Sequence, residues 1–318
     1  MISEFALDPT LVASWYDPKE WAFFREAFTA ETGRVGSAIG SNSLRKWRGM
    51  VVKRFHEKLP KLSEQSNERR RLEALLDDIT QRMFCRESSH PECPTWLEKA
   101  ITEHRNRPFD GILSASPYEA MPEVITPEML FSDNPPSSWK VRPNLVVDRT
   151  PEALTQALAP LIMRSKETIF IDPWFDPTAS RFTEPLAQIL KVIWDPGRFI
   201  SNPTVQLVTT AGKYGSNYHL SKCHEHLPKI IPVGHCLEVT LLQARENGEK
   251  FHNRYVLTPL AGVSLGTGLD ASNITMSQTD DIFRLSNEQR NKRWYQYVSG
   301  RGSEFEIMAG PHLIESLL

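Results

Sequence analysis

The fold prediction rests on two segments, FHNRYVLT at residues 251–258 and GTGLD at residues 266–270. Their spacing predicts two short strands joined by a turn. Side chains two residues apart in a strand point to the same face, so His252 and Arg254 are expected to lie together. The Gly-Thr-Gly turn would bring a hydroxyl and a carboxylate close to them. An imidazole, a permanent cation, a hydroxyl and a carboxylate are groups from which a phosphate site can be built.

Length and charge exclude several classes of protein. The chain has 318 residues, enough for about two domains with cores of their own. Its formal net charge of -2 gives no overall polycationic signature for nucleic acid or acidic membranes. No apolar run approaches the roughly 18–20 residues of a membrane span. The first residues, MISEF, lack the basic and apolar regions of a signal peptide. We therefore predict a cytoplasmic protein and do not expect a membrane partner.

The four cysteines are predicted to be free thiols, because none forms a Cys-x-x-Cys pair and cytoplasmic proteins rarely keep disulfides. A zinc site is the alternative, offered by a cluster of six residues: His219, Cys223, His224, His226, His235 and Cys236. The spacings match no common zinc template. We therefore expect scattered polar residues on and after a helix, with no metal and no cofactor.

Residues 1–138 predict a mainly helical N-terminal domain that contacts substrate or a partner. Apolar residues recur at helical spacing in four segments, which begin near Pro18, Ser43, Ser66 and Pro94. The segment NPPSS at residues 134–138 is the predicted linker, since two prolines suit neither a helix nor a central strand.

Residues 139–318 predict an α/β domain, because short apolar strands alternate with helices. Strands are predicted at 167–172, 204–209, 236–242, 251–258, 263–266 and 304–308, and helices at 151–163, 182–193, 217–227 and 287–298, with Pro185 expected to begin the second helix. Functional groups in such folds lie at strand ends and in the loops that follow.

Structural explanations of the same residues stay open. His252 could be a strand histidine satisfied by a backbone group, and Arg254 could pair with Asp270. Thr267 could only hold a tight turn, and Asp172 could cap the end of its strand. The placement of acid, hydroxyl and base at several separate strand ends nevertheless favours a site.

The combination resembles the phospholipase D superfamily, whose signature is His-x-Lys, an Asp five residues later, and then Gly-Ser-x-Asn. His252 takes the place of the histidine, Arg254 that of the lysine and Gly266-Thr267 that of Gly-Ser. The resemblance runs from about residue 144 to the C-terminus. It implies an α/β fold with a phospholipase-D-like mixed sheet flanked by helices. It also implies metal-independent phosphodiester cleavage by a nucleophilic histidine.

That mechanism needs two copies of the motif, and the chain has one convincing copy. His56-Glu57-Lys58 matches His-x-Lys but lies in a predicted helix with no glycine strand after it. A complete site therefore implies a homodimer through the phospholipase-D-like domain. The departures matter too, because Pro259 takes the acidic position and Leu269 the asparagine position. The His-x-Arg and Gly-x-Gly-Leu-Asp pattern is more similar to the C-terminal phospholipase-D-like domain of MIT-domain proteins, which implies binding without catalysis.

The segment around residues 45–61 is the most basic stretch of the chain. The candidate nucleic-acid-binding residues are Arg45, Lys46, Arg48, Lys53 and Arg54, with Lys213 in a later loop. A solvated helix face, and an exposed loop lysine at 213, are the simpler explanations.

We therefore predict a metal-independent nuclease acting on DNA or RNA. By analogy with the fold alone, we assign it to bacterial genome or phage defence. The catalytic set is His252 as nucleophile or general acid, Arg254 and Thr267 on phosphoryl oxygens, and Asp270 or Asp172 orienting the histidine. One alternative is an inert module that binds nucleic acid, phospholipid headgroups or a protein. Another is a structural subunit of a larger protein complex.

Overall fold

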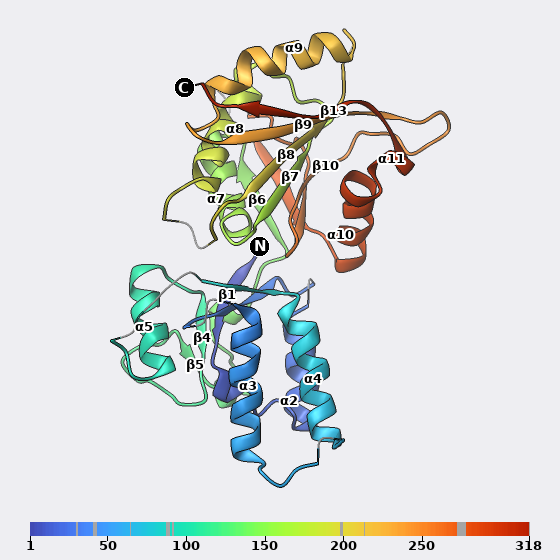
Figure 1. The fold of residues 1–318 in the computed structure, drawn as a ribbon. Coiled ribbons are helices and arrows are strands. Elements are labelled where there is room, and N and C mark those ends of the chain that lie inside the picture. The colour runs from blue at the N-terminus through green and yellow to red at the C-terminus, as the bar shows by residue number, and fades with distance from the viewer. Residues whose placement is uncertain are drawn as a thin grey trace. The chain divides into compact units, whose positions relative to one another are not determined.

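The computed structural model describes residues 1–29, 31–40, 43–63, 65–86, 90, 92–197, 200–212, 214–271 and 278–317. The chain divides into two compact units, Ile2–Arg142 and Pro143–Leu318 together with Met1. The boundary thus follows Arg142, where the sequence placed it after residue 138. The fold is mixed α/β in both units, with a parallel sheet in the first and a mixed sheet in the second (Figure 1).

The N-terminal unit contains a five-stranded parallel sheet that the sequence prediction of a mainly helical domain missed. The strand order is β3-β2-β1-β4-β5. The strands are β1 (Ser3–Leu7), β2 (Arg34–Ala38), β3 (Met83–Cys85), β4 (Gly111–Leu113) and β5 (Val124–Ile125). Three of them have three residues or fewer, and most of their residues are buried, so they show no alternation of apolar and polar residues.

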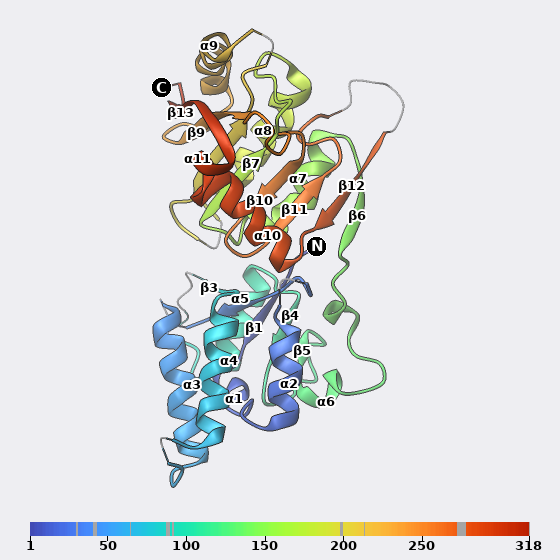
Figure 2. The same ribbon diagram turned by 90° about the vertical axis from the view of Figure 1, so that its right-hand side faces the viewer.

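Helices cover both faces of this sheet. The elements are α1 (Pro9–Val12), α2 (Pro18–Ala27), α3 (Leu44–Lys58), α4 (Asn67–Thr80), α5 (Trp96–Asn106), α6 (Pro127–Leu130) and a 3-10 turn at Ser137–Trp139. The long helices α2 to α5 confirm the four predicted ones. Each begins after a side-chain cap, and α3 buries Trp47, Val51 and Phe55 as expected from its apolar stripe. Figures 1 and 2 show α2, α3 and α4 on one face and α5 on the other.

A buried ion cluster centres on Arg86, at the end of β3. Its guanidinium is fully buried and donates to both carboxylate oxygens of Glu4, each at 2.7 Å. It also donates to Glu103 Oε1 at 3.1 Å and lies 3.7 Å from the centre of the Phe109 ring. Because Glu4 lies on β1 and Glu103 on α5, this one cation ties a central strand, an edge strand and a helix together.

The C-terminal unit is built on an eight-stranded mixed sheet, as the sequence predicted for this part of the chain. The order is β13-β9-β8-β7-β10-β11-β12-β6, with β7, β8 and β9 parallel and β10 antiparallel to β7. The strands are β6 (Asn144–Asp148), β7 (Glu167–Ile171), β8 (Thr204–Thr209), β9 (Cys236–Ala244), β10 (Arg254–Leu257), β11 (Gly262–Leu265), β12 (Thr279–Arg284) and β13 (Phe305–Glu315). The prediction missed β6 and β12.

The helices of this unit also lie on both faces of its sheet. They are α7 (Pro151–Ile162), α8 (Ser180–Ile193), α9 (Ser216–His226), α10 (Asn287–Trp294) and α11 (Arg301–Glu304), with a 3-10 turn at Leu227–Lys229 and a π turn at Tyr295–Ser299. Figures 1 and 2 show α7 and α8 on one face and α10 on the other. On the α10 side, Ile169 and Ile171 of β7 pack in one core cluster with Tyr297. Among the described residues, no helix is long and apolar enough to cross a membrane.

Helix α8 begins at Ser180, so the prediction that it starts at Pro185 was wrong. Proline inside a helix lacks the N–H that would bond to the carbonyl four residues earlier. That carbonyl belongs to Arg181, and it accepts a hydrogen bond from the Ala271 amide at 2.8 Å instead. The helix therefore tolerates Pro185 because a loop from another part of the chain uses the carbonyl left free.

We predict that Arg86→Met destabilises the N-terminal unit by about 3–5 kcal/mol, because it removes the guanidinium that both oxygens of the buried Glu4 carboxylate bind. The control is Arg48→Met, which removes the partner of the exposed Asp77 carboxylate and should cost about 1 kcal/mol or less. Thermal and urea unfolding of the full chain measures both. Equal, small losses would contradict a structural role for the Arg86 cluster.

Candidate functional site

Four strand ends meet at one edge of the C-terminal sheet. Because β10 runs antiparallel to both β7 and β11, the end of β7, the start of β10 and the end of β11 lie together. β12 begins at the same edge, since it is antiparallel to β11. The register pairs Tyr255 with Ile171, which places Arg254 opposite Asp172. The structure therefore brings together Asp172, Arg254 and the Gly266–Asp270 loop, as the sequence predicted.

Asp172 is the buried centre of this edge, with 1% of its surface exposed. Its Oδ1 accepts from the Trp174 amide at 3.0 Å and its Oδ2 from the Leu269 amide at 2.9 Å. Arg254 Nε lies 3.7 Å from Oδ1. Burial raises the pKa of Asp172, while the two amides and the Arg254 guanidinium lower it. The carboxylate thus connects three segments: its own loop, the loop after β11 and the start of β10.

The two glycines of the Gly-Thr-Gly turn are explained by carboxylates that press against them. Gly268 has φ +73°, and a Cβ there would overlap Asp172 Oδ2 and lie 2.5 Å from Arg254 Cδ. A Cβ at Gly266 would overlap Asp280 Oδ1. Thr267 donates both its amide and its hydroxyl to Asp280 Oδ2, each at 3.0 Å. The loop is therefore clamped from two sides by Asp172 and Asp280.

The remaining acid of the motif, Asp270, pairs with two arginines that the sequence analysis did not select. Its Oδ2 lies 3.3 Å from Arg149 Nη2 and 3.5 Å from Arg181 Nη1. Arg149 also donates to the Asp270 carbonyl at 3.0 and 3.1 Å. Arg254 pairs with Asp172 rather than Asp270, and its Nη1 donates to the Gly266 carbonyl at 2.7 Å.

His252 precedes β10, which begins at Arg254. The prediction that strand periodicity would align His252 with Arg254 was therefore wrong. The imidazole is exposed, and its Nδ1 lies 3.0 Å from the Lys250 carbonyl oxygen. A carbonyl can only accept, so Nδ1 must carry the proton, and in the neutral ring Nε2 keeps its lone pair. In the described part of the chain, neither Asp172 nor Asp270 forms a hydrogen bond or ion pair with this ring.

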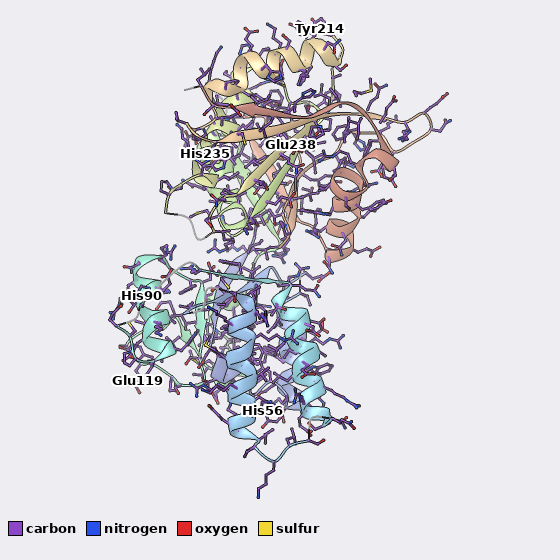
Figure 3. All side chains as sticks on the ribbon, viewed as in Figure 1. His56, His90, Glu119, Tyr214, His235 and Glu238 are labelled. Atoms are coloured by element: carbon purple, nitrogen blue, oxygen red, sulfur yellow. The ribbon has the colours of Figure 1, made fainter. Side chains whose placement is uncertain are left out.

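These contacts limit what the predicted residues can do. A hydroxyl has a single proton, and Thr267 donates it to Asp280, so it does not serve as a donor to a phosphoryl oxygen. Leu269 is 2% exposed. The second His-x-Lys sequence begins at His56, which lies on α3 as expected (Figure 3).

The candidate nucleic-acid-binding residues divide between the two units. Arg45, Lys46, Arg48, Lys53 and Arg54 lie on or beside the exposed side of α3 in the N-terminal unit. Two of them are already paired, Arg48 with Asp77 and Arg54 with Glu57. Lys213 is outside the described residues.

Three exposed aromatic side chains lie in the loops and helix that follow β7 and β8, a feature missing from the sequence analysis. Trp174 is 60% exposed, Tyr214 65% and Tyr218 48%. The Tyr214 and Tyr218 rings are 5.1 Å apart, and Figure 3 labels Tyr214 beside α9. The Thr210 hydroxyl donates to the Pro173 carbonyl at 2.8 Å, which joins the two loops. Burial, unlike residue type, cannot be read from a single sequence, so no pattern marked these residues.

The alternative zinc site was drawn from residues around α9. Cys223 is fully buried, and burial raises the pKa of its thiol to about 12. His235 stacks on Trp194 with ring centres 4.9 Å apart. Among the residues that the structure describes, no group of three His, Cys, Asp or Glu side chains is placed to hold a metal ion.

No protein-family model matches the sequence, and no curated protein matches it significantly. The resemblance to phospholipase D domains therefore rests on the motif residues alone, and everything it implies about activity is a proposal.

We predict that Gly268→Ala destabilises the C-terminal unit by about 2–4 kcal/mol, because it adds a clash with Asp172 to the strain of a positive φ. Gly234→Ala is the matched control, since Gly234 has φ +81° and open space around its Cβ position. It should cost only about 1 kcal/mol. Thermal unfolding of the two variants separates crowding from backbone strain. Equal losses would show that Asp172 does not press on the loop.

Proposed function

We propose that the C-terminal unit is a phospholipase-D-like module that binds the phosphodiester backbone of single-stranded nucleic acid without cleaving it. The observation that carries the proposal is the guanidinium of Arg254, which begins β10 two residues after the exposed His252 and lies at the same end of the sheet as the loop that carries the exposed Trp174. Arg254 and His252 contact the phosphate, and Trp174, Tyr214 and Tyr218 stack on bases.

The Arg254 guanidinium is oriented by contacts within the protein before a phosphate binds. Its Nη1 donates to the Gly266 carbonyl, and its Nε lies 3.7 Å from Asp172 Oδ1 without a hydrogen bond, so the guanidinium is already oriented and less side-chain entropy remains to be lost on binding. Its Nη2 has no hydrogen-bond partner among the described residues. A phosphodiester oxygen can accept from that nitrogen in a charge-assisted hydrogen bond.

The exposed aromatic residues favour nucleic acid over the other phosphate ligands. Trp174 lies in the loop that follows β7, and Arg254 begins the neighbouring strand β10, so the ring and the cation come from adjacent strands at the same end of the sheet. Bases stack on such rings with little dependence on sequence, while cations hold the backbone. A lipid headgroup offers no base to stack.

Binding without cleavage is favoured because the groups that would assist catalysis are engaged elsewhere. The Asp172 and Asp270 carboxylates bind amides and arginines, and neither one orients His252. The Thr267 proton goes to Asp280.

A metal-independent nuclease is the second candidate, and the Nδ1 contact of His252 favours it. A carbonyl that fixes the proton on Nδ1 leaves Nε2 as an exposed nucleophile. Because one chain supplies one such motif, this candidate requires two copies of His252 to face each other in a homodimer.

We predict that Trp174→Ala weakens binding of a labelled single-stranded oligonucleotide about tenfold or more, since stacking contributes about 1–3 kcal/mol per base. The matched control is Phe283→Ala, an exposed aromatic residue near the opposite end of β12 from Asp280. Fluorescence anisotropy measures both variants, with anionic vesicles as a competing ligand. Unchanged affinity in Trp174→Ala, or preference for the vesicles, would contradict the proposal.

The same samples, kept in EDTA, distinguish binding from turnover. Intact oligonucleotide after prolonged incubation is the expected result. Cleavage by the wild type that His252→Ala abolishes would select the nuclease instead. Equal residual cleavage in both would exclude His252 as the nucleophile.

A further inference from the structure

The N-terminal unit contains a cavity at the place where parallel α/β sheets bind ligands. The chain passes from β1 to β2 and β3 on one side and returns to β4 and β5 on the other, so the strand order reverses between β1 and β4. Ligands of such sheets bind outside the carboxyl ends of the strands at this reversal. Asp8 follows β1 there, and its amide donates to the Leu113 carbonyl at the end of β4.

The cavity has a volume of about 200 Å³ and combines charges of both signs with apolar walls. It is lined by Asp8, Pro9, Thr10, Met50, Lys53, Arg54 and Trp96. These residues come from Asp8 and the start of α1, from α3 and from the start of α5, which are separate segments of the chain. Convergence of several polar groups on one apolar-walled cavity is the pattern of a small-molecule site.

Asp8 is a fixed acceptor in this cavity. It is 7% exposed, its Oδ1 accepts from the Thr10 amide at 2.8 Å, and its Oδ2 accepts from the Ala115 amide at 3.2 Å. Each carboxylate oxygen can accept a second hydrogen bond, and a buried carboxylate next to a cavity seeks hydroxyl or amine donors. A sugar hydroxyl supplies such a donor.

The residues of α3 require a negatively charged group on the ligand, whereas Asp8 requires hydrogen-bond donors. Lys53 and Arg54 lie one helical turn from Met50 and place two cations at the cavity, and Lys58 Nζ reaches the Thr10 carbonyl at 3.1 Å. Glu57 offsets part of this charge through its ion pair with Arg54 at 2.8 Å. The ligand must therefore carry a negative group toward α3 and hydroxyl donors toward Asp8.

We propose that this cavity binds a sugar phosphate, either free or as the sugar-phosphate part of a mononucleotide. The phosphate pairs with Lys53 and Arg54, a sugar hydroxyl donates to Asp8, and Met50 and Trp96 form the apolar wall. The volume is below the 300–1,000 Å³ or so of pockets for drug-sized ligands, which limits the occupant to a molecule of this size. All residues that line this site belong to the N-terminal unit.

Isothermal titration calorimetry of the full chain tests the proposal with ribose 5-phosphate, AMP and inorganic phosphate as probes. Ribose 5-phosphate, AMP or both should bind more tightly than inorganic phosphate, and which one binds best identifies the source. Lys53→Gln should weaken binding about tenfold, the scale of one charge-assisted hydrogen bond. Arg45→Gln is the matched control, because Arg45 is an exposed cation on the same helix that does not line the cavity.

Asp8→Asn should remove the preference for sugar phosphate over inorganic phosphate while leaving phosphate binding in place. Three results would overturn the proposal. They are the absence of binding by both sugar phosphates, equal affinity for inorganic phosphate and ribose 5-phosphate in the wild type, and equal effects of Lys53→Gln and Arg45→Gln. Thermal unfolding of each variant shows whether it is folded, and Lys53→Gln changes an exposed residue, so it keeps the test valid if Asp8→Asn unfolds.

Discussion

The buried carboxylate of Asp172 is the constraint on which the C-terminal site depends. It accepts from two backbone amides in different loops and faces the guanidinium that begins β10. A buried carboxylate is costly unless such partners surround it, so these partners must hold their positions in the folded state. The same contact requires glycine at 268, because any side chain there would occupy the place of the Asp172 oxygen. The contacts of one carboxylate therefore determine the position of the loop, the position of Arg254 and the requirement for glycine at 268.

The sequence correctly predicted where the glycine motif at residues 266–270 lies. It did not predict why these residues are needed there. The spacing of GTGLD after HNR correctly predicted two short strands, which the structure shows as the antiparallel pair β10 and β11, with Arg254 bonded to the loop. It suggested donors aimed at a phosphate, whereas the Thr267 and Leu269 amides are used by Asp280 and Asp172. Asp280 could not be identified beforehand, because it belongs to a strand that the prediction missed and no local pattern links residues 267 and 280.

Elements of the N-terminal unit were predicted correctly where apolar residues recur at regular spacing, and were missed where they do not. Helices α2 to α5 have apolar stripes long enough to be recognised, and caps such as Ser43 and Thr95 mark their starts. Strand β1 carries Glu4, a charged residue that no strand pattern would place in a core. Its partner Arg86 lies 82 residues away, and that pairing exists only in the folded chain. The short, mostly buried strands, together with a buried charge satisfied over a long distance in β1, therefore concealed the N-terminal sheet.

The central claim is that Asp172 positions Arg254 and its loop for a phosphate, and the affinity of Asp172→Asn for a single-stranded oligonucleotide tests it most directly. Losing a negative charge near the site would by itself strengthen the attraction for phosphate. An asparagine amide group, however, donates where Asp172 accepts, so the loop and Arg254 lose their support. We expect binding about tenfold weaker, equivalent to about 1.4 kcal/mol, in a variant that remains folded at the assay temperature. Equal or tighter binding would contradict the account.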